Sequence, residues 1–234
     1  PKSGHERMLE ELERFAQMTS NELSPLAGES LSKLQSKWPK RERLKPPERL
    51  KFLMDFGDAA LRDGFESEAI KAYREADQLA SELDLAVDRR NPVRFALAVA
   101  HLRSAETANC CRENNEDSCI LPIQGGGIHQ NEEGARAAIS ILLKILETEP
   151  KGSDPYFEAQ WLLNLAVMTV DEFPAAVPTA YQMPPETFES SVEFPKFVNQ
   201  APNLGLNAFD LAGSVILDDF DGDGDFDILT CTMD

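Results

Sequence analysis

The sequence lacks any apolar run near the roughly 18 residues that a membrane-spanning helix needs, so we expect no membrane span. It also lacks a signal-peptide pattern and an initiating Met, since it begins at Pro1, which predicts a processed protein or a piece of a longer one. Basic residues are few, because 23 Lys and Arg stand against 41 Asp and Glu, for a net charge of −18. A nucleic-acid backbone requires a basic surface, so nucleic acid is excluded as a partner. The acidic surplus suits divalent cations or simply solubility.

Cysteine is also scarce, and three of the four cysteines lie in one polar segment. The spacing of Cys110, Cys111, Cys119 and His129 allows two interpretations. Three thiols and an imidazole can form a zinc site, although adjacent cysteines rarely reach the same metal ion. The interpretation that we prefer is a disulfide from Cys110 or Cys111 to Cys119, because the clustering favours an oxidising compartment. Cys231 falls in a predicted strand and is interpreted as a packed or partnerless thiol.

The first 46 residues predict short helices that cap the structure. Residues His5–Met18 place apolar side chains at helical spacing. A second short helix carries Leu31, Leu34 and Trp38 and should stop at Pro39. A basic link then leads to a stronger helix, which Pro46 and Pro47 open because Pro is tolerated in the first turn.

Residues 48–82 predict two antiparallel helices separated by Gly64. Small and large residues alternate in a way that lets the two helices approach closely: Leu53, Phe56, Gly57 and Ala60, then Ala69, Tyr73 and Ala76. This spacing resembles one tetratricopeptide repeat, whose period is about 34 residues. Ser81 stands where that family usually has Pro, and a plain helical hairpin is the alternative.

Residues 47–172 as a whole are therefore predicted to form a tetratricopeptide-like array. A second unit pairs a helix over Pro92–Thr107 with one over Glu132–Glu147, interrupted by a non-helical insertion at residues 108–131. A third helix, Asp154–Val170, is apolar on most faces, which is typical of a buried helix that closes the stack. His101 is interpreted as a packing residue.

Residues 173–210 contain too many prolines for a long helix or a central strand, and they predict an extended connector. We expect the connector to pack on the helices, because four of its side chains are too apolar to remain in water: Phe188, Phe194, Phe197 and Val198. The last segment, residues 211–234, predicts a β-hairpin with strands at Ser214–Leu217 and Ile228–Thr232.

The turn of this hairpin, Asp219–Asp227, carries acidic residues at alternate positions and is predicted to bind Ca²⁺. The candidate ligands are the carboxylates of Asp219, Asp221, Asp223 and Asp227 and the backbone carbonyl of Asp225. Gly224 permits the backbone to turn so that these oxygens converge. The residues argue against an EF-hand, whose twelfth position requires Glu but is Thr230 here, and apolar β-type residues follow instead of a helix. An acidic turn without metal is the alternative.

The segment Leu211–Leu229 resembles the opening blade segment of FG-GAP/VCBS-repeat β-propeller proteins. Further segments resemble the bacterial, cartilage-acidic-protein-like ASPIC/UnbV type, several of which carry tetratricopeptide-like helices before the propeller: Phe194–Leu206, Ser118–His129 and Trp161–Ala166. The resemblance implies a calcium-binding loop between two blade strands. It also implies secreted or cell-surface proteins, with the periplasm as a further location, in which the propeller is a binding module rather than an enzyme.

The sequence departs from that family in having one calcium loop, whereas propellers contain about four to eight blades. A lone hairpin is marginal in water, and its open edges can pair with a strand of another chain. We therefore predict a mainly α, non-enzymatic, extracellular module that binds calcium and protein partners or copies of itself, through the β edge and the helical groove. The alternative is the helical accessory region of a larger propeller-containing enzyme or electron-transfer protein.

Overall fold

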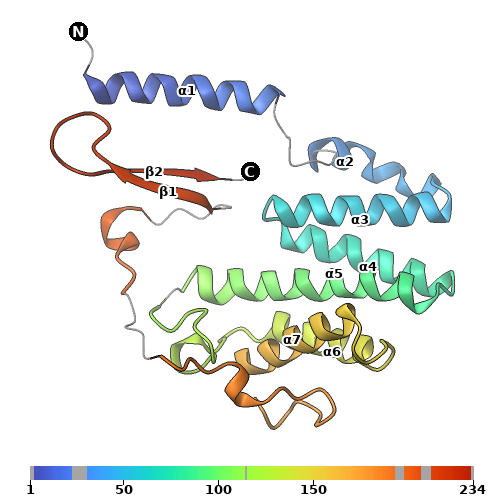
Figure 1. The fold of residues 1–234 in the computed structure, drawn as a ribbon. Coiled ribbons are helices and arrows are strands. Elements are labelled where there is room, and N and C mark those ends of the chain that lie inside the picture. Colours follow the sequence, from blue (N-terminus) through green and yellow to red (C-terminus); the bar gives the residue numbers. More distant parts are fainter. Residues whose placement is uncertain (1–2, 23–30, 114, 193–197, 207–211, 233–234) are drawn as a thin grey trace.

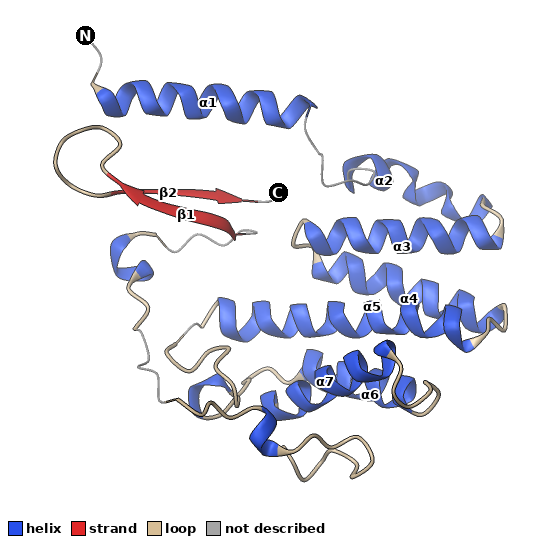
Figure 2. Cartoon of the chain, in the orientation of Figure 1, coloured by secondary structure: helices blue, strands red, loops and turns tan. Residues whose placement is uncertain are grey.

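The computed structural model describes residues 3–22, 31–113, 115–192, 198–206 and 212–232. In these ranges, seven helices form a packed array and two strands form a C-terminal antiparallel hairpin, which confirms the mainly α prediction (Figures 1 and 2). The helices are α1 Gly4–Glu22, α2 Leu31–Lys37, α3 Pro46–Arg62, α4 Glu66–Glu82, α5 Val87–Glu106, α6 Glu133–Leu146 and α7 Asp154–Thr169. From α3 to α7, each helix packs against the next one in the chain. None of the described helices is long and apolar enough to cross a membrane.

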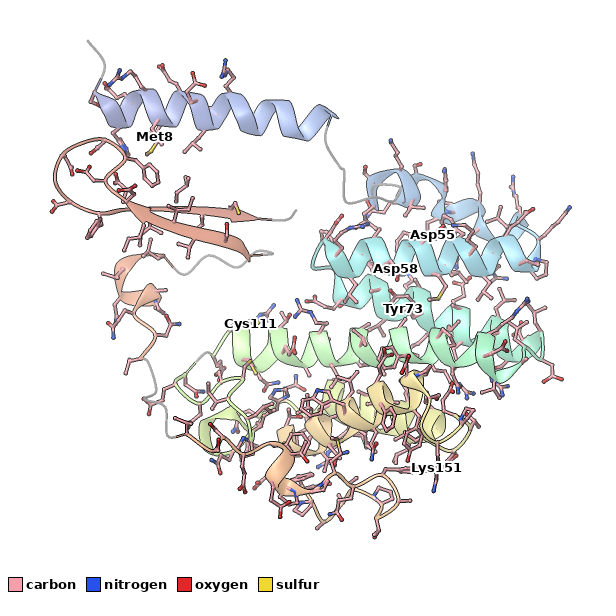
Figure 3. All side chains as sticks on the ribbon, in the orientation of Figure 1. Met8, Asp55, Asp58, Tyr73, Cys111 and Lys151 are labelled. Carbon is pink, nitrogen blue, oxygen red and sulfur yellow. The ribbon has the colours of Figure 1, made fainter. Side chains whose placement is uncertain are left out.

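Helices α3 and α4 pack closely because small residues line their contact. Ala60, Ala69 and Ala76 are fully buried between them. Gly57 faces Tyr73 so closely that a Cβ at Gly57 would lie 2.4 Å from Cε1 of the Tyr73 ring. The Tyr73 hydroxyl donates a hydrogen bond of 2.5 Å to Asp58, which joins the two helices a second time (Figure 3). The helical pair predicted for residues 48–82 is therefore confirmed.

The region before α3 follows the sequence prediction in part. Leu31 and Leu34 of α2 are buried in the same core cluster as α3. The chain then continues as a 3₁₀ helix over Trp38–Arg43, so it does not stop at Pro39 and the first part of the predicted basic link is helical. Trp38 packs on Phe56 with ring centroids 4.3 Å apart, so this 3₁₀ helix is tied to the core.

Helix α5 begins at Val87, so the prediction that it starts at Pro92 was wrong. Pro92 lies beyond the first turn, and the helix continues through it although Pro has no N–H to donate to the carbonyl of Asp88. Helix α5 also extends into a π-helical turn over Thr107–Cys111, and a 3₁₀ turn covers Gly125–Gly127. The segment 108–131, predicted to be non-helical, therefore contains a π-helical turn at its start and a 3₁₀ turn in its second half.

The connector packs on α7, as predicted for its first half. Phe188 is buried, with its ring centroid 5.1 Å from that of Trp161 and 5.6 Å from that of Phe173. Asn164 of α7 also holds the backbone of the connector. Its amide N–H donates to the carbonyl of Tyr181, and its side-chain oxygen accepts from the Met183 N–H.

The second half of the connector is only partly described. Val198 is exposed, so the expectation that it packs was wrong, and Phe194 and Phe197 lie outside the described residues. Val198 precedes a 3₁₀ turn at Ala201–Leu204 and belongs to none of the three apolar clusters found among the described residues.

The hairpin consists of β1 Ala212–Asp218 and β2 Asp227–Thr232, each slightly longer than predicted. Asp218 pairs with Asp227 and Val215 pairs with Thr230, with an irregularity between Ala212 and Val215. Apolar side chains are exposed along both strands and the turn: Val215, Ile216, Leu217, Phe226 and Ile228. Within the described residues, β1 and β2 pair only with each other.

Candidate metal centre

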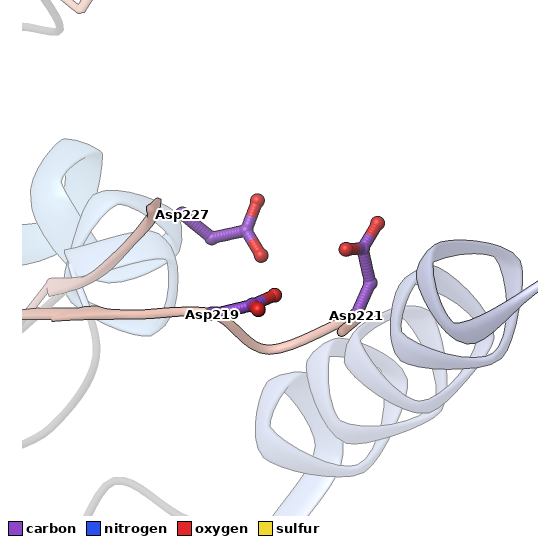
Figure 4. Close-up of side chains that lie close together, drawn as sticks. All are labelled: Asp219, Asp221 and Asp227. Atoms are coloured by element: carbon purple, nitrogen blue, oxygen red, sulfur yellow. The ribbon is translucent and has the colours of Figure 1, made fainter. Parts of the chain in front are cut away.

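Three of the predicted calcium ligands converge at the turn of the hairpin. One carboxylate oxygen each from Asp219, Asp221 and Asp227 lies within 4.8 Å of the other two (Figure 4). Asp219 follows β1, Asp221 lies in the turn, and Asp227 opens β2. Among the described residues, no other three His, Cys, Asp or Glu side chains bring ligand atoms so close together. This group can hold a metal ion.

The turn is wound around its own carboxylates by backbone hydrogen bonds. Asp219 Oδ1 accepts from the N–H groups of Gly222 and Asp223, at 2.7 and 3.1 Å. Asp219 Oδ2 accepts from the Gly224 N–H at 3.1 Å. Gly222 and Gly224 have φ of +77° and +95°, a left-handed conformation that glycine adopts at little cost. The two glycines therefore let a short turn bring carboxylates from both of its ends together.

The remaining predicted ligands do not join this group. Asp223 Oδ1 instead accepts a hydrogen bond of 2.9 Å from the Asp225 N–H. The Asp225 side chain is exposed and is not part of the converging set. Asp225 is predicted to bind Ca²⁺ through its backbone carbonyl, a role that does not require its carboxylate to join the group.

Electrostatic repulsion makes this arrangement favour a cation. Two like charges about 4 Å apart repel by about 1 kcal/mol in water and by about 4 kcal/mol near a protein surface. Three carboxylates meet in the turn, and no Lys or Arg ion pair is found with any of them among the described salt bridges. Calcium prefers six to eight oxygen ligands and can combine such carboxylates with carbonyl oxygens and water.

The first turn of α1 lies against this acidic turn, a contact that the sequence did not reveal. A Cβ at Gly4 would come within 2.8 Å of the Asp221 carbonyl oxygen, so only glycine allows this approach. Ser3 and Glu6 form a capping box, in which the Glu6 N–H donates to Ser3 Oγ and the Ser3 N–H to Glu6. A helix N-terminus carries partial positive charge and therefore suits acidic neighbours. In the sequence, the capping pattern Ser3-Gly4-His5-Glu6 indicates a helix N-terminus but not which segment packs against it.

The cysteine segment is partly assembled. Cys110 Sγ lies 3.4 Å from Nε2 of His129, and Cys119 is near enough to contribute to the raised pKa of Cys110. Cys111 is exposed at the end of α5 and is not part of a converging metal-ligand set (Figure 3). All four cysteines are thiols in the structure, and the disulfide to Cys119 stays a prediction.

The protonation of this segment does not suit nucleophilic catalysis. Burial, with a smaller contribution from Cys119, raises the pKa of Cys110 to about 12, while burial lowers the pKa of His129. Both shifts keep the pair neutral, whereas a catalytic cysteine requires a thiolate at neutral pH.

Two other predicted residues are placed as follows. Cys231 is an exposed free thiol, so it is not packed but has no disulfide partner, as the second alternative predicted. Its sulfur accepts a hydrogen bond of 3.2 Å from the Ser214 N–H. Hydrogen bonds from Ser214 lower the pKa of the Cys231 thiol. His101 is buried against Arg74, which confirms its packing role.

Comparison with known proteins adds no family. No protein-family model matches the chain, and no match was found among curated proteins or among solved structures.

Proposed function

We propose that this protein is a non-enzymatic, extracellular or cell-surface module that binds Ca²⁺ at the hairpin turn and binds a protein partner through the hairpin. The observation that carries the proposal is the convergence of Asp219, Asp221 and Asp227 at the turn of a hairpin whose apolar side chains are exposed. The helices α3 and α4 serve in this proposal as one tetratricopeptide-like unit of a supporting array.

Calcium is the metal that this turn suits best. The converging ligands are all carboxylate oxygens, whereas zinc prefers sulfur and nitrogen. Magnesium demands a nearly ideal octahedron, while calcium accepts irregular sets of oxygens. A rotation of the Asp223 side chain away from the Asp225 N–H would add a fourth carboxylate, and the Asp225 carbonyl would add a further oxygen.

A partner strand is needed because the hairpin has little to stabilise it. A two-stranded hairpin is marginal in water, and its unpaired edges can accept another strand. The side chain of Val215 is 65% exposed and that of Phe226 is 75% exposed, so both strand and turn leave apolar surface uncovered. Burial of such side chains is worth about 1.5–3 kcal/mol each. We propose a second copy of this chain as the first partner to test.

The test combines calcium titration with light scattering on the intact chain. Asp219→Asn removes a converging carboxylate and should weaken calcium binding by at least about tenfold, or about 1.4 kcal/mol. Asp225→Asn is the matched control, because it removes the same charge from the same turn but keeps the backbone carbonyl. It should bind calcium within about threefold of the wild type, a change below about 0.7 kcal/mol.

Light scattering with calcium and then with a chelator tests the assembly. We expect calcium to produce dimers or larger particles that the chelator dissociates in the wild type and in Asp225→Asn. Absence of saturable calcium binding would refute the metal site, and an equal loss in both variants would show that only total charge matters. Calcium binding by a chain that stays monomeric would refute self-assembly.

That last result would support the second candidate, the helical accessory region of a larger propeller-containing protein. The observation that favours it is the same exposure of the hairpin, which resembles a blade without its neighbours. In that case calcium stabilises the turn of a blade, and the function resides elsewhere in the larger protein.

A further inference from the structure

The segment from α2 to the first turns of α3 carries the opposite charge to the rest of the chain. Residues 33–51 contain eight Lys and Arg against two Glu, a net charge of +6. Because the whole chain carries −18, its other residues carry −24, with 15 basic side chains against 39 acidic ones. A positive segment on so acidic a protein attracts an anionic partner.

The 3₁₀ helix that follows α2 sorts these side chains onto two faces. A 3₁₀ helix has about three residues per turn, so side chains three positions apart lie in line. Trp38 and Arg41 are half-buried on the inner face, whereas Lys40 and Arg43 are exposed on the outer one. Lys37, one turn before Lys40, is also exposed and continues the line. We call Lys37, Lys40 and Arg43 the basic row.

Contacts on the inner face hold the basic row in place. Trp38 packs on Phe56, and the Arg41 guanidinium lies 4.3 Å from the centroid of the Trp38 ring. Arg41 Nε donates to both carboxylate oxygens of Glu75 in α4, at 3.0 and 2.9 Å. Arg49 of α3 donates to the same carboxylate at 2.6 Å. Two arginines thus share the charge of Glu75, and the row stands on an element that is fixed to the core.

The outer side chains lack the acidic neighbours that other basic residues have. Lys40 and Arg43 form no ion pair with any described acidic residue, and neither does the nearby Lys45. Glu42, the acid within the 3₁₀ helix, lies 3.8 Å from Arg41 instead. Exposed basic residues elsewhere pair within their own helices or just beside them: Lys51 with Asp55, Arg103 with Glu106, and Arg136 with Glu132. The charge of the row is therefore available to another molecule.

A short acidic loop fits the basic row better than an extended polyanion does. A nucleic acid or an anionic membrane would also face the rest of the chain, whose charge of −24 it would repel. A loop can meet the row alone, because charges farther away than about 8 Å are largely screened at physiological salt. The hairpin turn is such a loop, since residues 218–227 contain six Asp and no basic residue, a charge of −6.

The hairpin turn and the basic row lie far apart within one chain. Figure 1 shows the turn at one end of the molecule and the junction of α2 and α3 at the other. Contact between them therefore requires two chains. It joins two different surfaces, so each chain in contact still offers a free turn or a free row, and the contact can continue from copy to copy.

We propose that the basic row binds the acidic hairpin turn of a second copy of this chain, head to tail. This contact deepens the proposed self-assembly through the hairpin, on which it rests, because it names the surface of the second copy that receives the turn. Ca²⁺ in the turn would change its charge from −6 to −4, so the attraction to the row persists in the calcium-bound state. The contact is electrostatic, so salt weakens it, whereas strand pairing at the β edge depends little on salt.

Sedimentation velocity of the full chain at several concentrations, in Ca²⁺ and in chelator, measures the association. The double variant Lys40→Glu/Arg43→Glu should weaken it at least about tenfold, because like charges then face the turn. Arg112→Glu/Lys151→Glu is the matched control: it removes one exposed Arg and one exposed Lys elsewhere for the same change in total charge (Figure 3 labels Lys151). The control should associate within about threefold of the wild type. Raising the salt from about 0.1 M to about 1 M, which shortens the screening length from about 10 Å to about 3 Å, should dissociate the wild type.

A mixing experiment covers the case in which a variant fails to fold. Asp225→Lys reverses one charge of the turn without touching the three converging carboxylates, and it should also weaken association of the pure variant. Each variant keeps one intact surface. An equal mixture of Lys40→Glu/Arg43→Glu with Asp225→Lys should therefore associate again, as pairs and not as longer chains.

Calcium-dependent assembly that Lys40→Glu/Arg43→Glu leaves unchanged would overturn the role of the row and leave the proposed calcium site and self-assembly standing. An equal loss in the control variant, or a mixture that does not associate, would also overturn it. Salt-sensitive association in chelator, lost in Lys40→Glu/Arg43→Glu by a chain that binds no calcium, would support the row and refute the metal site. A chain that stays monomeric but binds vesicles of anionic lipid through Lys40 and Arg43 would overturn the contact between copies and assign the row to a lipid surface.

Discussion

The close contact between Gly57 and Tyr73 gives the most direct test of how α3 and α4 pack. Gly57→Ala would place a Cβ 2.4 Å from the Tyr73 ring, where nonbonded carbon atoms normally lie about 3.5–4.0 Å apart. The ring cannot move away easily, because Tyr73 is 1% exposed and its hydroxyl is bonded to Asp58. The substitution must therefore displace the ring or the helix by about 1 Å.

Two opposing effects determine the magnitude. Replacing Gly by Ala inside a helix stabilises by about 0.5–1 kcal/mol, because the unfolded chain loses freedom. Overpacking a core costs about 1–3 kcal/mol, and loss of the bond to Asp58 adds about 0.5–1.5 kcal/mol. The cost is larger, so we expect the free energy of unfolding to fall by about 2 kcal/mol.

Urea unfolding followed by circular dichroism and by tryptophan fluorescence measures this loss. With a slope of about 2 kcal/mol per molar urea, the midpoint should fall by about 1 M. The control is the same substitution in a Tyr73→Leu background, which removes the ring and should leave Gly57→Ala neutral or stabilising. A stability equal to or above that of the wild type, or the same effect in both backgrounds, would refute the packing argument.

The remaining predictions concern buried titratable groups. Burial first, and then the hydrogen bond to Asp58, raise the pKa of Tyr73 well above its usual value of 10.0, so the unfolded chain loses this proton before the native one does. Stability should therefore fall as pH rises above about 10, and Tyr73→Phe should be less sensitive to pH there in alkaline unfolding experiments. Burial, and then Arg74, lower the pKa of His101 below 6.5 against an opposing contribution from Glu133. The unfolded chain then binds the extra proton, so stability should fall as pH drops below about 6.5, and urea midpoints should show a smaller fall in His101→Gln.

The sequence predicted the elements whose pattern is local. The α3 and α4 pair follows from the alternation of small and large residues around Gly57 and Tyr73, and the acidic turn follows from its Asp and Gly spacing. Both patterns act within about 34 residues, so they can be read without knowing the rest of the fold.

The errors involve contacts that a pattern does not contain. Pro is common at the start of a helix, yet α5 begins at Val87, with Asp88 in its first turn and the Ala86 carbonyl accepting from the Arg90 N–H. The packing of Gly4 on Asp221 joins the two ends of the chain, and no periodicity within either segment indicates it. Asn109 gave no signal as a buried polar residue, because the hydrogen bonds that justify its burial go to Asn131.

The helical array and the hairpin differ in what stabilises them, and this difference determines where a ligand can act. The array has its own buried clusters, so a ligand bound there would add to a structure that is already stable. The described part of the hairpin has exposed apolar side chains on both strands and relies on the hydrogen bonds of its turn. A ligand contributes most where the unliganded state is least stable, because binding shifts the equilibrium toward the competent form. Calcium at Asp219 is therefore expected to change the conformation and the assembly of the chain more than a ligand of the helical array would.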